Sequence, residues 1–279
     1  MNKELTLGYS PCPNDTYIFA ALVHGKVAIP GVVVRERLED VETLNRLAQE
    51  VALDITKVSY HAAGLLRERY ALLRSGGALG RGCGPLIVAL PGTTLDDVRR
   101  GTIAIPGRLT TAGLLLRLFD PRMQGAVVMT FDRIMQAVAA GRVTAGLIIH
   151  ESRFTYPRYG LEQLVDLGEW WERHSGLPVP LGGIMALRTL GPDRIRSVEE
   201  AIRESLRYAR GHEDEVLAYC RLHSQEMDET VMRSHIGLYV NDFTRDLGSE
   251  GTEAVLRLFR EAEERGILPP FAGPLFADG

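Results

Sequence analysis

Short apolar runs alternate with amphipathic segments through residue 187. The runs have the length of strands and are bounded by polar residues or by Gly and Pro, which is typical of a covered sheet. Between them, apolar residues three or four positions apart predict helices, as at Val41, Leu44 and Ala48. The strands predicted in this way cover residues 5–9, 32–38, 54–60, 70–73, 85–89, 102–105, 127–129, 147–149, 165–168 and 184–187.

After residue 187 the pattern is helical almost throughout. Ser197 can cap a helix whose apolar residues form one stripe. His212, His223 and His235 lie in this part without metal-ligand spacing, so surface or cap roles are expected for them. Further helices are predicted over residues 213–220, 228–238 and 251–266.

The order of these elements predicts two α/β domains joined by two connections. The Gly-rich segment 75–85 and the segment 178–183 are the expected crossings. The first domain would be built from both ends of the chain, residues 1–88 and 184–279, and the second, residues 89–183, would be inserted in it. Two such domains enclose a cleft that can close on a small molecule.

An imidazole follows directly on one of the apolar runs. The run 147–149 ends at His150, which is followed by a carboxylate, a hydroxyl and a guanidinium. Open α/β sheets bind ligands outside the carboxyl ends of their strands, so His150 is expected to face a crevice. The alternative is a solvated strand end, or an imidazole hydrogen-bonded within a loop.

The first predicted strand also ends in polar residues. It runs into a loop that contains Ser10, Pro11 and Asn14, and Asn14 or Asp15 can cap the helix that follows. Such a loop can contact a ligand, or it can be a stiff connector with a well-capped helix. Cys12 would be a nucleophile only with a partner base, and the sequence does not identify one.

Two further strand ends carry groups that can bind an anion. Lys57 and Ser59 can hold an anionic or hydroxylated ligand, although exposed Lys and turn Ser are common. Thr110 and Thr111 open a helix whose first amides lack internal acceptors, and their hydroxyls can add two donors for a carboxylate. The alternative is an ordinary Thr N-cap, which stabilises a helix by about 1 kcal/mol.

Composition narrows the class of protein. The net charge of −4 argues against a nucleic-acid binder that depends on a basic surface. The N-terminus lacks the apolar core of a signal peptide, and no run is long enough to span a bilayer. Cys12, Cys83 and Cys220 are odd in number and widely spaced, which favours reduced thiols in the cytoplasm.

Several segments of the chain carry a resemblance to a known enzyme family. They are Ser10-Pro11-Cys12-Pro13-Asn14-Asp15-Thr16, Lys57-Val58-Ser59-Tyr60, Arg74-Ser75-Gly76-Gly77-Ala78-Leu79-Gly80, Gly107-Arg108-Leu109-Thr110-Thr111-Ala112 and, above all, residues 146–156 around His150. With these segments the chain resembles the 1,4-dihydroxy-6-naphthoate synthases of the futalosine route to menaquinone, and the similarity runs along essentially its whole length. The resemblance implies a two-lobed, type II periplasmic-binding-protein-like fold in a cytoplasmic enzyme that works without a metal or an organic cofactor.

The resemblance also implies roles for individual residues. The family converts cyclic dehypoxanthinylfutalosine to 1,4-dihydroxy-6-naphthoate, and its catalytic base matches His150. Its substrate contacts match Lys57, Val58, Ser59, Thr110 and Thr111. Beyond the resemblance, we expect the loop with Ser10, Pro11 and Asn14 and the strand end from Lys57 to Ser59 to clamp the polyol. Glu151, Arg153 or Tyr156 is expected to orient the imidazole, and the sequence does not say which.

Two other functions compete with this one. A solute-binding protein for a small organic anion would use the same cleft without chemistry, and the related chorismate dehydratase would use it for another reaction. His150 favours the synthase, because a pure binder needs no base. The expected partner is a small carboxylate substrate, with neither nucleic acid nor membrane, and a homodimer remains open.

Overall fold

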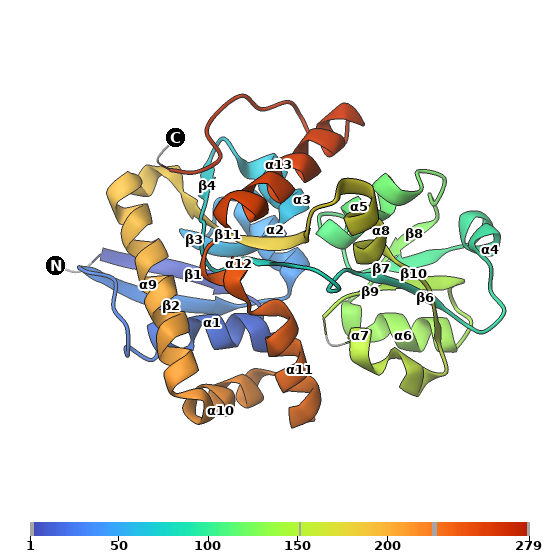
Figure 1. The fold of residues 1–279 in the computed structure, drawn as a ribbon, viewed down its shortest axis with the longest axis horizontal. Helices are drawn as coiled ribbons and strands as arrows, with labels where there is room; N and C mark the ends of the chain where they lie inside the picture. The colour runs from blue at the N-terminus through green and yellow to red at the C-terminus, as the bar shows by residue number, and fades with distance from the viewer. Residues whose placement is uncertain (1–2, 151, 225–227, 278–279) are drawn as a thin grey trace.

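The computed structural model describes residues 3–150, 152–224 and 228–277, and it contains two β-sheets, one in each of two lobes (Figure 1). The sheet of the first lobe has the strand order β2-β1-β3-β11-β4, with β5 paired to β11. β1 is parallel to β2 and β3, whereas β11 runs antiparallel to β3, β4 and β5. The strands are β1 (Lys3–Tyr9), β2 (Val32–Leu38), β3 (Ile55–Ser59), β4 (Tyr70–Leu72), β5 (Ala78–Gly80) and β11 (Val179–Leu187).

The sheet of the second lobe has the order β10-β6-β9-β7-β8. β7 is parallel to β8 and β9, whereas β6 is antiparallel to β9 and β10. Every residue of β6, β7 and β9 is buried, as their unbroken apolar sequences require. The strands are β6 (Leu86–Ala89), β7 (Ile103–Ile105), β8 (Ala126–Val128), β9 (Ala145–Ile148) and β10 (Glu162–Asp166).

Helices cover both faces of the first sheet (Figure 1). α1 packs against α9, α10 and α11 on one side, whereas α3 and α13 pack on β11 from the other side. The chain ends therefore both contribute to this lobe. The helices are α1 (Pro13–Val23), α2 (Val41–Gln49), α3 (Tyr60–Leu66), α9 (Pro192–Gly211), α10 (Glu213–His223), α11 (Glu229–Tyr239), α12 (Asp242–Arg245) and α13 (Gly248–Glu264), with a 3-10 turn η2 (Arg188–Leu190) before α9.

One of the apolar clusters extends across both lobes. A single cluster of buried side chains includes Tyr60 and Phe259 of the first lobe and Leu115, Leu147 and Trp171 of the second. α5 contacts α3 and α13 across the junction, so the lobes are in contact rather than separated. The second lobe contains α4 (Leu95–Arg100), α5 (Thr111–Phe119), α6 (Phe131–Ala139), α7 (Ser152–Thr155), the 3-10 turn η1 (Tyr156–Tyr159) and α8 (Leu167–Ser175).

Several predicted element limits differ from the structure. β6, expected to carry the chain between domains, pairs with β10 and β9 of the second sheet, and β11 joins the first sheet from Val179 onward. The predicted limit at residue 88 thus falls inside a strand. The Gly-rich crossing contains β5, and α9 begins at Pro192, so Ser197 lies inside the helix and donates to the carbonyl of Asp193.

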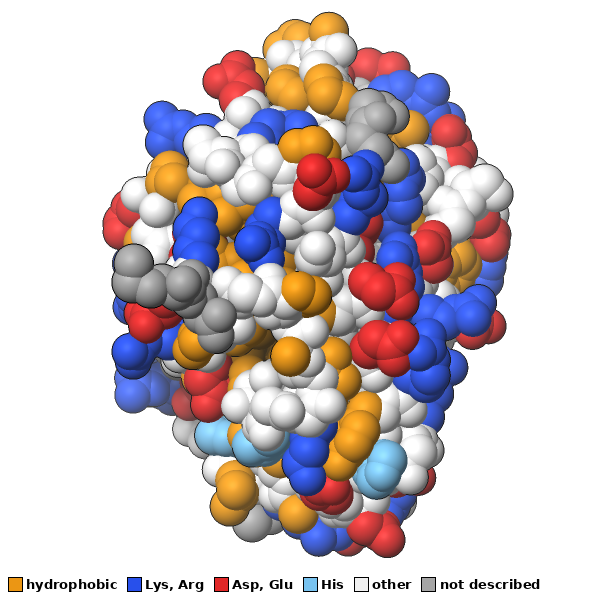
Figure 2. Space-filling model, turned by 90° about the vertical axis from the view of Figure 1, so that its left-hand side faces the viewer, with side chains coloured by type: hydrophobic (Ala, Val, Ile, Leu, Met, Phe, Trp, Pro, Cys, Tyr) orange, Lys and Arg blue, Asp and Glu red, His pale blue; other side chains and the backbone are white. Residues whose placement is uncertain are grey.

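Charged side chains of both signs are interspersed on the end of the first lobe shown in Figure 2. On α9, neighbouring residues form the pairs Arg196–Asp193, Arg203–Glu200 and Arg207–Glu204. Among the helices of the described residues, none combines the length and apolarity needed to cross a membrane.

Candidate functional site

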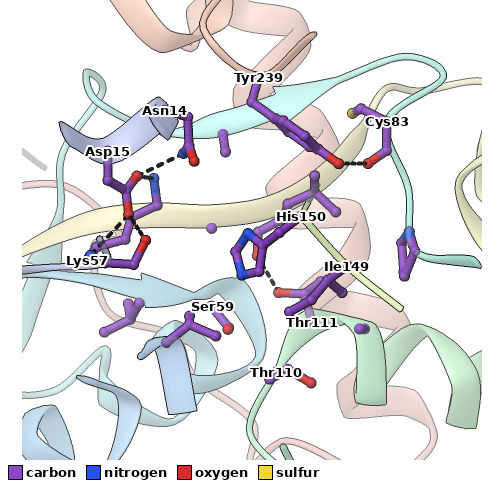
Figure 3. A pocket seen from close by; sticks show the side chains of 18 of the residues that line it. Asn14, Asp15, Lys57, Ser59, Cys83, Thr110, Thr111, Ile149, His150 and Tyr239 are labelled. Atoms are coloured by element: carbon purple, nitrogen blue, oxygen red, sulfur yellow. Dashed lines mark hydrogen bonds and ion pairs between the residues drawn. The ribbon is translucent and has the colours of Figure 1, made fainter. Parts of the chain in front are cut away.

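A pocket lies between the two lobes, at the carboxyl ends of β1, β3 and β9 (Figure 3). It encloses about 650 Å³, which includes its open mouth. The first lobe contributes the residues Ser10, Asn14, Asp15, Val41, Lys57, Val58, Ser59, Ala78, Leu181, Gly182 and Tyr239. The second lobe and its connection contribute Cys83, Gly84, Pro85, Thr110, Thr111, Ala112, Ile149 and His150.

Asp15 is the centre of the polar side of the pocket. Its carboxylate accepts hydrogen bonds from the amide and hydroxyl of Ser10 and from the side-chain amide of Asn14, at 3.2, 2.7 and 2.8 Å. It also accepts from the ammonium of Lys57 at 2.8 Å, and both side chains of this ion pair are buried. The positive charge of Lys57 is therefore balanced by Asp15 without an anionic ligand.

The first turn of α1 places these groups. The helix begins at Pro13, which is tolerated at the first helical position because its missing N–H would have no acceptor there. Cys12 is the N-cap, so the prediction that Asn14 or Asp15 caps the helix is wrong. Both lie inside the first turn instead, where a carboxylate is favoured by the helix dipole.

Ser59 is held in place by Asn45 of α2. Its amide donates to the Asn45 side-chain oxygen at 2.9 Å, and its hydroxyl accepts from the Asn45 amide at 3.2 Å. In the described part of the chain the hydroxyl proton of Ser59 has no acceptor, so it can be donated to a ligand. Val58 also lines the pocket and is fully buried.

The N-terminus of α5 faces the pocket with amides rather than with hydroxyls. Thr110 accepts from the amide of Gly113 and donates to the carbonyl of Gly107, and Thr111 donates to the carbonyl of Leu181. The expectation that both hydroxyls are donors for a ligand is therefore wrong for this arrangement. Among the described residues, the amides of Thr111 and Ala112 have no acceptor, as the first helical positions require.

His150 stands just beyond β9 with an unusual backbone. Its φ is +56°, in the left-handed region that few residues other than Gly adopt. The ring is directed into the pocket, toward the first lobe (Figure 3). Its Nδ1 lies 3.5 Å from Sγ of Cys12, and the Phe131 ring contacts it edge-on with centroids 5.2 Å apart.

The surroundings of His150 favour the neutral ring. Burial lowers its pKa to about 4, the nearby Lys57 cation adds to the lowering, and Asp15 opposes it. The imidazole is therefore unprotonated at neutral pH, with one nitrogen available as a proton acceptor.

His235 of α11 is a site residue that sequence reasoning missed. Its ring is fully buried, its Nε2 lies 3.0 Å from the side-chain oxygen of Asn14, and it stacks on His150 with centroids 6.2 Å apart. The prediction of a surface or cap role for it is wrong. Asp15 was also missed as a pocket group, although it lies in the loop segment that carries the resemblance.

Not every predicted residue lies in the pocket. Pro11 does not line it. The guanidinium of Arg153 donates to the carbonyl of Gly84 and pairs with Asp166, and the backbone amide of Arg153 donates to the carbonyl of His150 at 3.3 Å. Glu151 lies outside the described residues. Within the described ranges, no group of three or more His, Cys, Asp or Glu side chains could hold a metal ion.

Comparisons with known proteins agree on one family. A family model described as menaquinone biosynthesis matches residues 5–264. A 1,4-dihydroxy-6-naphthoate synthase of Thermus thermophilus is 56% identical over 277 residues, covering 98% of this chain and 99% of the relative. The enzyme of that name from Streptomyces coelicolor is 45% identical over 271 residues, covering 95% of each chain.

Solved structures agree on the fold. A crystal structure of a protein from Archaeoglobus fulgidus is 36% identical, with a TM-score of 0.89 and coverage of 95% of this chain and 98% of that chain. The periplasmic aliphatic sulphonate binding protein SsuA of Escherichia coli is 13% identical, with a TM-score of 0.67 over 100% of this chain and 95% of that chain. The predicted periplasmic-binding-protein-like fold is thereby confirmed, and the chain belongs to the menaquinone biosynthesis family, among the 1,4-dihydroxy-6-naphthoate synthases.

Proposed function

We propose that the protein converts cyclic dehypoxanthinylfutalosine to 1,4-dihydroxy-6-naphthoate as a carbon–carbon lyase of the cytoplasm. Two relatives at 56% and 45% identity carry the name of this activity. The observation that best supports the chemistry is the place of His150, an unprotonated imidazole that faces a polar wall across the pocket.

In this proposal His150 is the general base. Aromatising the second ring of the product requires that a proton be removed while the sugar-derived fragment leaves, and an imidazole suits that step. A bound carboxylate adds negative charge near the ring and favours the imidazolium that forms.

The substrate carboxylate would bind at the N-terminus of α5. The ammonium of Lys57 already donates to Asp15 at 2.8 Å and to the carbonyl of Gly76 at 3.3 Å, so its charge is balanced by Asp15 and one N–H remains for a ligand. The amides of Thr111 and Ala112 have no internal acceptor and lie at the positive end of the helix dipole. On the opposite lobe, the Ser59 hydroxyl can donate to the polyol, whereas the Ser10 hydroxyl donates to Asp15 and can only accept from it.

A solute-binding function is the alternative from another class. It needs the pocket but not a base, so turnover separates it from the synthase. Purified protein is given cyclic dehypoxanthinylfutalosine, and formation of the naphthoate is followed by absorbance and mass spectrometry.

We expect turnover by the wild type and a loss of at least roughly 100-fold in kcat for His150→Ala, with substrate binding retained. His24→Ala, which removes an exposed imidazole at the far end of α1, is the control and should match the wild type. Normal turnover by His150→Ala would exclude it as the base. Binding without turnover by the wild type would favour the solute-binding function.

A further inference from the structure

The ring of His150 is held largely by the opposite lobe. Sγ of Cys12, in the first lobe, lies 3.5 Å from Nδ1 of His150. The ring of His235, also of the first lobe, lies nearly parallel to the His150 ring, with an interplanar angle of 18° and centroids 6.2 Å apart. Phe131 is the contact from the second lobe, to which His150 itself belongs. The backbone of one lobe therefore carries the imidazole, while side chains of the other lobe orient it.

We propose that Cys12 is a positioning residue for His150: the Nδ1–H donates to its sulfur, and Nε2 is left as the base. The inference rests on the proposed function, in which His150 accepts a proton from the substrate. Cys12 does not line the pocket, so it acts through the imidazole and not on the substrate itself.

The tautomer decides whether a neutral imidazole can work as a base. One ring nitrogen carries the proton and the other accepts, and the hydrogen bond made by one nitrogen fixes the role of the other. If the thiol donated to Nδ1 instead, the proton would lie on Nε2 and the nitrogen facing the substrate could accept nothing. A sulfur acceptor at Nδ1 gives the productive arrangement.

A thiol also suits the charges around this site. Carboxylates are frequent orienting partners of a catalytic or metal-bound His, and they add a full negative charge beside the ring. Here Asp15 already lies close enough to raise the pKa of His150, and the substrate brings a carboxylate of its own. Sulfur is a weak acceptor that fixes the ring with less negative charge than a carboxylate.

The backbone around Cys12 is fixed well enough for this role. The residue is the N-cap of α1 and is 5% exposed. Its carbonyl accepts from the amides of Asp15 and Thr16, each at 3.1 Å, and Pro13 after it restricts its backbone to the extended conformation seen. The sulfur is therefore presented at a defined point of the first lobe.

One consequence concerns lobe closure. Because sulfur and ring belong to different lobes, the base is fully oriented only when the lobes meet.

The test compares Cys12→Ala and Cys12→Ser with the wild type. Cys220→Ala is the matched control, because it removes another buried thiol near the same loop. The Cys220 thiol donates to the carbonyl of Pro13 and does not line the pocket. The nitrogen chemical shifts of His150 report its tautomer in the substrate-free protein. Steady-state assays give kcat, KM and the pH profile.

We expect wild-type His150 to carry its proton on Nδ1, and Cys12→Ala to shift the population toward the Nε2–H form. The kcat of Cys12→Ala should fall about tenfold, the effect of losing one hydrogen bond, with KM within about twofold. Cys12→Ser should recover part of this loss, since a hydroxyl can also accept from Nδ1. Cys220→Ala should leave the tautomer and kcat unchanged.

An Nε2–H tautomer in the wild type would overturn the proposal, as would an unchanged tautomer and kcat in Cys12→Ala. An equal loss in Cys220→Ala would also overturn it, because loosened packing would then explain the effect. The wild-type spectrum can be recorded even if the protein does not turn the substrate over and even if a variant fails to fold. Absence of turnover with an Nδ1–H tautomer would refute the proposed reaction while leaving the role of Cys12 supported.

Discussion

At the scale of single residues, Asp15 and Lys57 form an ion pair that is buried inside the protein. Its two side chains are 2% and 6% exposed, so neither can turn to water if its partner is removed. Removing one member of such a pair commonly costs about 3–5 kcal/mol, whereas replacing both can be nearly neutral.

We therefore expect Asp15→Asn to lower stability by about 3–5 kcal/mol and the double variant Asp15→Asn, Lys57→Met to recover most of that loss. Denaturant unfolding of the wild type, the two single variants and the double variant measures the coupling. Additive losses in the double variant would show that the pair is not energetically coupled.

Three imidazoles with lowered pKa values, His61, His150 and the fully buried His235, predict how stability depends on pH. Burial lowers the pKa of both His61 and His150 to about 4, below the usual value near 6.5. Between these values the unfolded chain binds more protons than the folded one, so stability rises with pH across this window. We expect the unfolding midpoint to fall as the pH is lowered from about 6.5 to 4, and a flat midpoint there would contradict this account.

The same lowered pKa predicts the pH dependence of catalysis. The acid limb of kcat/KM reports the free enzyme and should lie near pH 4, well below the value of an ordinary His. The acid limb of kcat reports the complex and should lie higher, because the bound carboxylate raises the pKa of His150. Initial rates from pH 3.5 to 8 check both limbs, and coincident limbs near pH 6.5 would contradict the first.

At the scale of secondary structure elements, two glycines allow a close backbone contact. Gly84, just before β6, packs against Gly168 in the first turn of α8. A Cβ atom added to Gly84 would lie 2.2 Å from Cα of Gly168, and one added to Gly168 would lie 2.6 Å from Cα of Gly84. Backbone cannot move aside as a flexible side chain can, so neither position admits alanine without a shift of the chain.

Gly84→Ala should lower the Tm by roughly 5 °C or more, the size expected for overpacking in a domain of this length. Gly211→Ala, at the end of α9 with open space around its Cα, is the control and should leave the Tm unchanged or slightly raised. Calorimetry distinguishes the two, and equal Tm values would mean that the glycine contact can relax.

Local pattern was enough to predict most of these elements, and distant contacts explain the exceptions. The apolar run before His150 gave a buried strand, because hydrophobic periodicity depends on neighbours in sequence. His235 was misjudged, since its burial results from packing against Asn14, 221 positions away along the chain. The sequence could not identify a partner for Cys12 for the same reason, because its contact with His150 spans 138 positions.

The site was predictable only to the level of which strand ends carry polar groups. Lys57, Thr110 and Thr111 were placed near the pocket by that rule. The sequence could not show that Lys57 forms an ion pair with Asp15, or that the hydroxyls of Thr110 and Thr111 donate to backbone carbonyls. Those partners come from other elements, and they decide which donors remain for a ligand.

At the scale of the whole molecule, Glu42 links the lobes. Its carboxylate on α2 accepts from the amide of Leu109, with both oxygens 3.2 Å away, at the loop before α5. We expect Glu42→Ala to favour separated lobes, raise KM roughly tenfold and increase the radius of gyration in small-angle scattering. Glu42→Gln keeps an acceptor and should stay near the wild type, whereas equal effects of both substitutions would point to charge alone.

The position of β11 has a consequence for how the chain folds during its synthesis. β11 lies between β3 and β4, yet it leaves the ribosome more than a hundred residues after them. Until it arrives, both strands expose hydrogen-bonding edges with no neighbour, a state prone to mispairing. The inserted lobe contains all the strands of its own sheet and can form first, so nascent chains arrested before residue 179 should bind chaperones through their earliest part.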